Sequence, residues 1–113
     1  MTAIGEAKLW YAQRLSAMVL AICVLIHLAT LIYATQHGLT AAAILERTRG
    51  SALVATFYAI FVVGCAIHVP IGLARVFEET IHWRGRSLWV AVAAIGAGIL
   101  GLGLRAVYAV VIG

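Results

Sequence analysis

The sequence predicts an all-α protein, an integral membrane bundle of three transmembrane helices. Hydrophobic residues make up 65% of the 113-residue chain and charged residues 11%, whereas a soluble domain has about 45–50% apolar and about 25% charged residues. The apolar residues gather in three runs, and each run is long enough to cross the ~30 Å hydrocarbon core of a bilayer. We therefore expect one membrane-anchor domain, residues 1–113, without an extramembrane catalytic domain.

The first predicted span covers residues 15–34. Trp10 and Tyr11 precede it, and aromatic residues at this position are typical of anchors at the membrane surface. The start of the chain is too polar for a signal peptide, so we expect this span to be retained. In the polar connection 35–50, Thr40 is a good N-cap for a short surface helix.

The second predicted span, residues 51–76, contains Pro70, the only proline of the chain. A proline inside a helix frees a carbonyl and favours a kink. The third span, residues 87–112, follows a polar connection, residues 77–86. Its small residues allow close approach of another helix and predict a packing face: Ala94, Gly96, Gly98, Gly101 and Gly103.

The basic residues predict the orientation of the chain. Of the 8 lysines and arginines, five fall on the side of the N-terminus and three on the other side. Because basic residues are enriched in cytoplasmic connections, we expect the N-terminus in the cytoplasm and the C-terminus outside. Charges at the ends of apolar runs contact lipid headgroups, so the net charge of +4 does not indicate nucleic-acid binding.

His68 is the first candidate for chemistry, because ionisable side chains in the hydrocarbon region are costly and indicate function. Gly64 and Gly72 lie one turn before and after it on the same helix face, which predicts a gap beside the imidazole. Arg75 lies about 10 Å further along nearly the same face, close to the distance from a porphyrin centre to its propionates. Our hypothesis is that His68 is an axial ligand of haem b, bordered by the two glycines, and that Arg75 contacts a propionate.

His27 is the second histidine in a predicted span. It lies about 20 Å along its helix from Arg14, whereas His68 lies about 10 Å from Arg75 on the next helix. With both arginines at the same surface, the two imidazoles differ in depth by about 9 Å. Since two ligands of one haem lie at nearly the same depth, each histidine needs a partner histidine from another chain. The alternatives are two haems, or one haem with His27 in another role.

Two segments carry a family resemblance: residues 13–17, QRLSA, and residues 68–79, HVPIGLARVFEE. They resemble the membrane-anchor cytochrome b subunits of succinate dehydrogenase and fumarate reductase, which show an Arg-hydrophobic-Ser-Gly segment and a His-x3-Gly segment running on to a carboxylate. Ala17 replaces the small glycine of the family, Gln13 replaces a histidine, and Glu79 stands near the position of the carboxylate. Members with a histidine in the first span, as His27 is here, hold two haems.

The resemblance implies the membrane subunit of an enzyme complex, succinate:quinone oxidoreductase, that links the tricarboxylic acid cycle to electron transport. The subunit would lie in the bacterial cytoplasmic (inner) membrane, dock a flavoprotein and an iron–sulfur subunit, and pair with a second anchor chain, the same or different. It would hold one or two b haems with axial ligands shared with that chain. The implied quinone site is at the cytoplasmic surface, with Arg14 and Ser16 first and then Trp10, Gln13, His82 and Trp83.

Three alternatives remain open from the residues. The chain is an anchor of the same complex without haem, in which His68 is hydrogen-bonded within the bundle. It is a small proton-coupled transporter or channel subunit, in which His27 and His68 relay protons. Or it is a purely structural anchor or assembly factor, for which the glycine-rich third span is sufficient.

Overall fold

A computed structural model describes residues 2–113. They form four helices and no strand: α1 (Ala3–His37), α2 (Ala41–Thr48), α3 (Ala52–Thr80) and α4 (Arg86–Val111). The helices α1, α3 and α4 are each long and apolar enough to cross a membrane. The predicted all-α membrane bundle of three spans is therefore confirmed, and each helix extends past or close to the ends of its predicted apolar run.

Side-chain caps fix where the first three helices begin. The hydroxyl of Thr2 accepts a hydrogen bond from the Gly5 amide at 3.0 Å, so α1 begins well before its apolar run. Thr40 accepts from the amide of Ala43 at 3.1 Å, which confirms the predicted cap of the short helix α2. Each cap satisfies an amide that has no partner within its helix.

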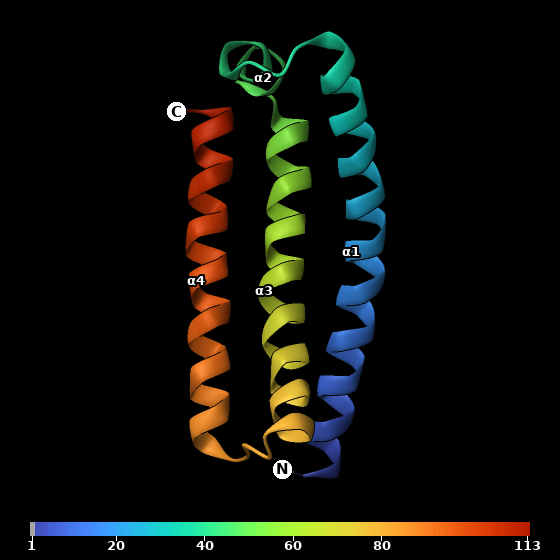
Figure 1. The fold of residues 1–113 in the computed structure, drawn as a ribbon, viewed down its shortest axis with the longest axis vertical. Helices are drawn as coiled ribbons and strands as arrows, with labels where there is room; N and C mark the ends of the chain where they lie inside the picture. The colour runs from blue at the N-terminus through green and yellow to red at the C-terminus, as the bar shows by residue number, and fades with distance from the viewer. Residues whose placement is uncertain (1) are drawn as a thin grey trace.

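The helix α3 lies between α1 and α4, and each packs on a different face of it (Figure 1). The N-terminus and the α3–α4 connection lie together at one end of the bundle, which we call the N-terminal end (Figure 1). The C-terminus and α2 lie at the other, the C-terminal end. Neighbouring spans are antiparallel, because each connection begins and ends at the same end of the bundle (Figure 1).

Two glycines of α4 bring its backbone against α3. A Cβ added at Gly96 would lie 2.7 Å from Pro70 Cγ and 3.0 Å from the carbonyl oxygen of Ala66, the group that the proline frees. A Cβ at Gly103 would lie 2.5 Å from a methyl carbon of Val62. In contrast, Cβ positions at Gly98 and Gly101 have nothing within 4 Å. The glycines predicted to form one packing face therefore lie on two faces of α4. Gly96 and Gly103 pack on α3, and Gly98 and Gly101 face away from it.

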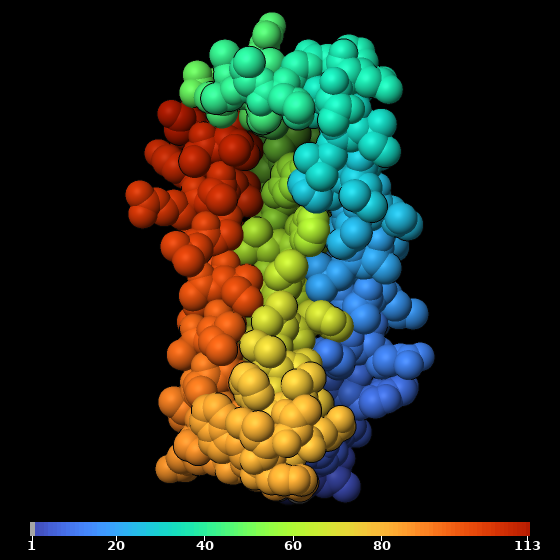
Figure 2. All heavy atoms as spheres, viewed as in Figure 1, coloured from blue at the N-terminus to red at the C-terminus, as the bar shows by residue number. Residues whose placement is uncertain are grey.

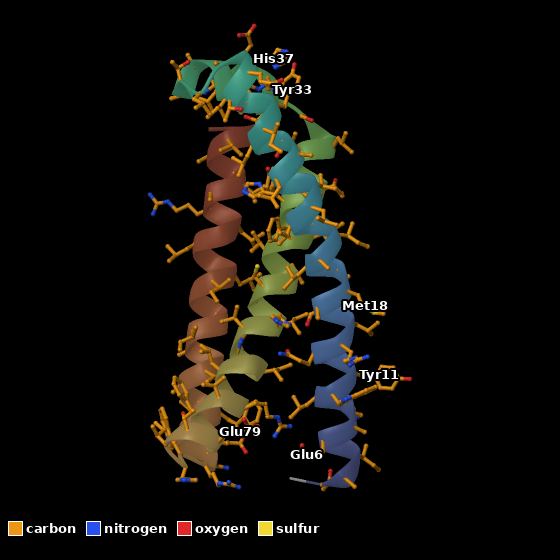
Figure 3. All side chains as sticks on the ribbon, turned by 45° about the vertical axis from the view of Figure 1, so that its right-hand side comes forward. Glu6, Tyr11, Met18, Tyr33, His37 and Glu79 are labelled. Carbon is orange, nitrogen blue, oxygen red and sulfur yellow. The ribbon has the colours of Figure 1, made fainter. Side chains whose placement is uncertain are left out.

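The interface between α1 and α3 is a narrow seam. Ser16, Cys23 and Ala34 are the buried residues of α1, and the spacing of seven between the first two is typical of one stripe along a helix. Most other side chains of α1 face outward. Tyr11 and Met18, for example, project away from the bundle (Figure 3). This exposure suits a helix whose outer faces contact lipid or another chain.

The short helix α2 is tied across the C-terminal end. Thr48 donates a hydrogen bond to the carbonyl of Val110 at 2.7 Å, and Arg47 donates to the carbonyl of Gly38 at 2.8 Å. The Arg47 guanidinium also lies 5.6 Å from the ring centre of Tyr33, which stacks on His37 (Figure 3). Arg47 thus satisfies a carbonyl at the end of α1, where the helix itself leaves acceptors unpaired.

A hollow separates α1 from α4 near the C-terminal end, with α3 as its floor (Figure 2). Its volume is about 280 Å³. We call it the C-terminal groove, and its lining comes from all four helices: His27, Ile44, Thr48, Tyr58, Val62, Gly103, Ala106, Val107 and Val110.

Candidate functional site

His68 of α3 faces α1 and is held there by a hydroxyl. Its Nδ1 lies 3.2 Å from Ser16 Oγ, and Ser16 Oγ donates to the carbonyl oxygen of Gln13 at 3.0 Å. Ser16 is only 6% exposed, and His68 is half-buried. A hydroxyl that donates to one group has lone pairs left for another. The arrangement therefore suits an imidazole with its proton on Nδ1 and a lone pair on Nε2.

The second ring nitrogen of His68 keeps an open side. Nε2 takes part in none of the hydrogen bonds of the described residues, and it is not among their buried unpaired nitrogen and oxygen atoms, which are Gln13 Oε1 and Glu78 Oε1. An imidazole fixed through one nitrogen and open at the other is the usual form of a metal-ligating histidine. Ser16, which is also predicted at the quinone site, is the hydrogen-bond partner of His68.

His27 of α1 is paired with Tyr58 of α3. Its Nδ1 lies 3.0 Å from the Tyr58 hydroxyl, and its ring meets the rings of Tyr58 and Phe61 edge to face, with centroids 5.8 Å apart. The pair lies about 15 Å along the helices from the Ser16–His68 pair. The two histidines are therefore too far apart in depth to share one iron.

The predicted depth difference of about 9 Å was too small because it took Arg14 and Arg75 as level. The structure pairs Arg75 with Glu6, which lies two turns nearer the N-terminus than Arg14. The register of α1 against α3 is thus shifted from the one assumed, and the shift increases the separation of the two imidazoles. At either separation, the two histidines are too far apart in depth to share one iron.

The two glycines beside His68 face α1. A Cβ at Gly64 would lie 3.0 Å from Leu20 Cδ2, and a Cβ at Gly72 would lie 3.2 Å from Gln13 Nε2. Both glycines therefore serve the close approach of the two helices, and the space directly beside them is filled by α1. Their predicted role beside a haem stays a prediction.

Gly64 also borders an open groove between α1 and α3, which we call the α1–α3 groove. It measures about 490 Å³. Its lining is apolar except for the hydroxyl of Ser16: Ala12, Leu15, Ser16, Val19, Ala59, Ile60, Val63, Gly64 and Ile67. This groove puts apolar surface at the depth of the Ser16–His68 pair, where a flat apolar cofactor or the helix of another chain can pack.

Arg75 joins α1 to α3 at the N-terminal end. Its guanidinium lies 2.6 Å from a carboxylate oxygen of Glu6 and 3.5 Å from one of Glu78. Glu6 lies at this end of α1, with Glu79 across from it on α3 (Figure 3). The side chain of Arg75 is 38% exposed, so it remains accessible to a further anionic group, such as the predicted propionate.

Part of the predicted quinone site comes together at the same end. Trp10 and Gln13 line a groove of about 440 Å³ together with Arg75 and Glu6. We call it the N-terminal groove. Gln13 lines the groove, but its Oε1 is buried and has no hydrogen-bond partner. Arg14 does not line this groove, and its guanidinium lies 5.3 Å from the ring centre of Trp10.

The other two predicted quinone residues lie at the corner between α3 and α4. Trp83 donates from its indole nitrogen to Ser87 Oγ at 2.8 Å, and its ring lies 5.7 Å from that of Phe77. It packs on a buried cluster, Ala74, Leu88 and Val92. His82 is exposed, with a left-handed backbone φ of 55°. Neither side chain lines the N-terminal groove.

The sequence did not indicate three residues of these sites, Glu6, Tyr58 and Glu78. The signal for Tyr58 was present, because it is the one tyrosine of the second predicted span, and a hydroxyl in hydrocarbon needs a partner. The two glutamates had no such signal. Their importance depends on the pairing of α1 with α3.

Comparison with protein-family models, curated proteins and solved structures gave no match for this chain. Within residues 2–113, no three histidine, cysteine, aspartate or glutamate side chains lie close enough together to hold a metal ion. The geometry described above is therefore the basis for a functional assignment, together with the resemblance of residues 13–17 and 68–79.

Proposed function

We propose that the chain is the haem b-binding membrane-anchor subunit of a succinate:quinone oxidoreductase. It would lie in a bacterial inner membrane, dock a flavoprotein and an iron–sulfur subunit, pair with a second anchor chain, and pass electrons to or from quinone. The observation that carries this proposal is the Ser16–His68 pair, because it fixes one imidazole nitrogen and leaves the other open. Both residues belong to the two segments that resemble the family.

The residues around His68 fit an axial ligand. The hydroxyl of Ser16 orients the ring as an outer-shell partner does in other metal sites, and the apolar α1–α3 groove adjoins the pair. His68 would hold the iron, and Arg75 would contact a propionate at the N-terminal end. Bound haem, with a histidine of the second chain as the other ligand, supplies a one-electron carrier without an open iron position. A second haem would need His27 as its ligand.

The N-terminal groove supports the quinone part of the proposal. The residues that line it include three with donor groups, Trp10, Gln13 and Arg75, and quinone carbonyls need such donors. Apolar side chains, Leu9 and Ile71, form other walls of the groove. We place the quinone ring there, with Arg14 behind Trp10.

The experiment that tests the haem assignment compares His68→Ala with His37→Ala. His37 is exposed at the end of α1 and lies outside every groove described here, so its loss is the matched control. We expect the reduced-minus-oxidised b-type absorbance of the purified complex to be abolished or halved in His68→Ala and unchanged in His37→Ala. An unchanged haem-to-protein ratio in His68→Ala would falsify the assignment.

The same experiment tests the nearest alternative, an anchor without haem. The packing of Gly64 and Gly72 against α1 favours that version, because it leaves no gap beside the imidazole within one chain. A colourless wild-type complex that still contains the flavoprotein and iron–sulfur subunits would support it. In that case the hydrogen bond to Ser16 is the whole role of His68.

A further inference from the structure

Both membrane histidines are hydrogen-bonded through Nδ1 to a hydroxyl of the neighbouring helix, but the two hydroxyls differ. Ser16 Oγ has a second acceptor within reach, the carbonyl of Gln13 at 3.0 Å. The hydroxyl of Tyr58 has no acceptor other than His27 among the hydrogen bonds of the described residues. This difference determines which way each hydrogen bond runs.

At His68 both protons find an acceptor in only one arrangement. If Ser16 donates to Gln13, the Nδ1–H of His68 donates to Ser16, and no donor is left unpaired. If Ser16 donates to His68 instead, the proton of the imidazole moves to Nε2, where the structure offers no acceptor. An unpaired donor away from water costs about 1–3 kcal/mol. His68 therefore carries its proton on Nδ1 and a free lone pair on Nε2.

At His27 the hydrogen bond runs in the opposite direction, from the hydroxyl to the imidazole. A phenol in hydrocarbon must donate to the acceptor that it has, and for Tyr58 this acceptor is Nδ1 of His27. Either arrangement leaves one donor without a partner, but a phenol is a stronger donor than a neutral imidazole N–H, and an imidazole nitrogen is a stronger acceptor than a phenol oxygen. The hydrogen bond from Tyr58 to Nδ1 is therefore the favoured one. In this arrangement the proton of His27 lies on Nε2 and the lone pair of Nδ1 is taken by Tyr58, so neither ring nitrogen offers a free lone pair to iron.

We infer that the two histidines are fixed in opposite tautomers, so that only His68 presents a nitrogen to haem iron while His27 is a hydrogen-bond donor bordering the C-terminal groove. This inference rests on the proposed function for the identity of the metal group, but the tautomers themselves do not. It assigns one haem-binding histidine to each chain. Ser16 is then a positioning residue for His68, and Tyr58 is one for His27.

The tautomers are tested by nuclear magnetic resonance of the full-length, haem-free chain with its histidines labelled with the heavy isotope of nitrogen. His68→Ala and His27→Ala assign the signals. We expect an Nδ1–H pattern for His68 and an Nε2–H pattern for His27. Ser16→Ala should remove the Nδ1–H pattern of His68, whereas Ser16→Thr, which keeps the hydroxyl, should retain it. The reverse pattern at either histidine, or an unchanged His68 signal in Ser16→Ala, would overturn the inference.

The role in iron binding is tested on the complex. We expect His27→Ala to keep the wild-type haem-to-protein ratio, with no more than one haem for each copy of this chain. Loss of haem in His27→Ala, or a second haem for each chain, would overturn the inference. If the wild-type complex contains no haem at all, the proposed function fails, and the labelled histidines still decide the tautomers.

Discussion

Gln13 is the residue that connects the Ser16–His68 pair with the N-terminal groove. Its backbone carbonyl accepts the hydroxyl of Ser16, its amide nitrogen would lie 3.2 Å from a Cβ at Gly72, and its Oε1 is buried without a partner. A buried acceptor without a partner is unfavourable, so a turn of the Gln13 side chain that brings Oε1 to the groove would be favoured when a ligand there supplies a donor. The hydroxyl of a reduced quinone is such a donor.

We therefore expect Gln13→Leu to lower quinone-linked turnover of the complex by about 10-fold, in keeping with the loss of one hydrogen bond to a ligand, about 1–1.5 kcal/mol. Dye-linked succinate oxidation should not change, because it does not use the groove. Arg14→Leu is the comparison, since Arg14 lies outside the lining and contacts Trp10. Its effect on quinone turnover should be smaller. Equal loss of both activities in Gln13→Leu would indicate failed assembly instead.

The two histidines were predictable from the sequence because ionisable residues are rare in hydrocarbon. Their partners were not, since Ser16 and Tyr58 each meet a histidine of another helix. Such a contact depends on how far one helix is shifted along its neighbour. The charges at the helix ends gave this shift only approximately, because Arg75 extends to Glu6 rather than to the level of Arg14.

Among the helices, α4 shows that glycines of one helix differ in role according to the face on which they lie. Gly96 lies against Pro70 and the carbonyl of Ala66, whereas Gly98 faces outward. The sequence predicted a packing face along α4, but it contained five small residues on more than one side of the helix. Only the position of α3 shows which of them are in contact.

We expect Gly96→Ala to destabilise the bundle, because its Cβ would lie 2.7 Å from a proline ring carbon that cannot rotate away. Overpacking of this kind costs about 1–3 kcal/mol. Gly98→Ala is the matched control. Its Cβ meets nothing within 4 Å, and alanine favours a helix over glycine by about 0.5–1 kcal/mol. The midpoint of unfolding in detergent, followed by circular dichroism, should fall for Gly96→Ala and be equal or higher for Gly98→Ala. Equal midpoints for both variants would contradict this packing.

In the whole molecule, the charged residues lie at the two ends of a bundle whose long sides are apolar. The segments of the N-terminal end carry Lys8, Arg14, Arg75, Arg84 and Arg86, and those of the C-terminal end carry Arg47 and Arg49 (Figure 1). Arg105 lies on α4, within two turns of its C-terminal end. The grouping of charges by end was predictable from span order alone, because an odd number of spans puts the two termini on opposite sides. Which end faces the cytoplasm depends on the excess of basic residues.

This excess predicts that the N-terminal end faces the cytoplasm. Cysteines introduced at Glu46 in α2 and at Glu79 near the end of α3 report on the two ends, since both positions are exposed. Replacing glutamates leaves the basic residues unchanged, and acidic residues contribute little to orientation. With Cys23 and Cys65 replaced by alanine, a membrane-impermeant maleimide should label Glu46→Cys in intact spheroplasts. It should label Glu79→Cys only after lysis. Labelling of Glu79→Cys in intact spheroplasts would reverse the orientation. It would then place the N-terminal groove, and the quinone site proposed there, on the side away from the cytoplasmic flavoprotein.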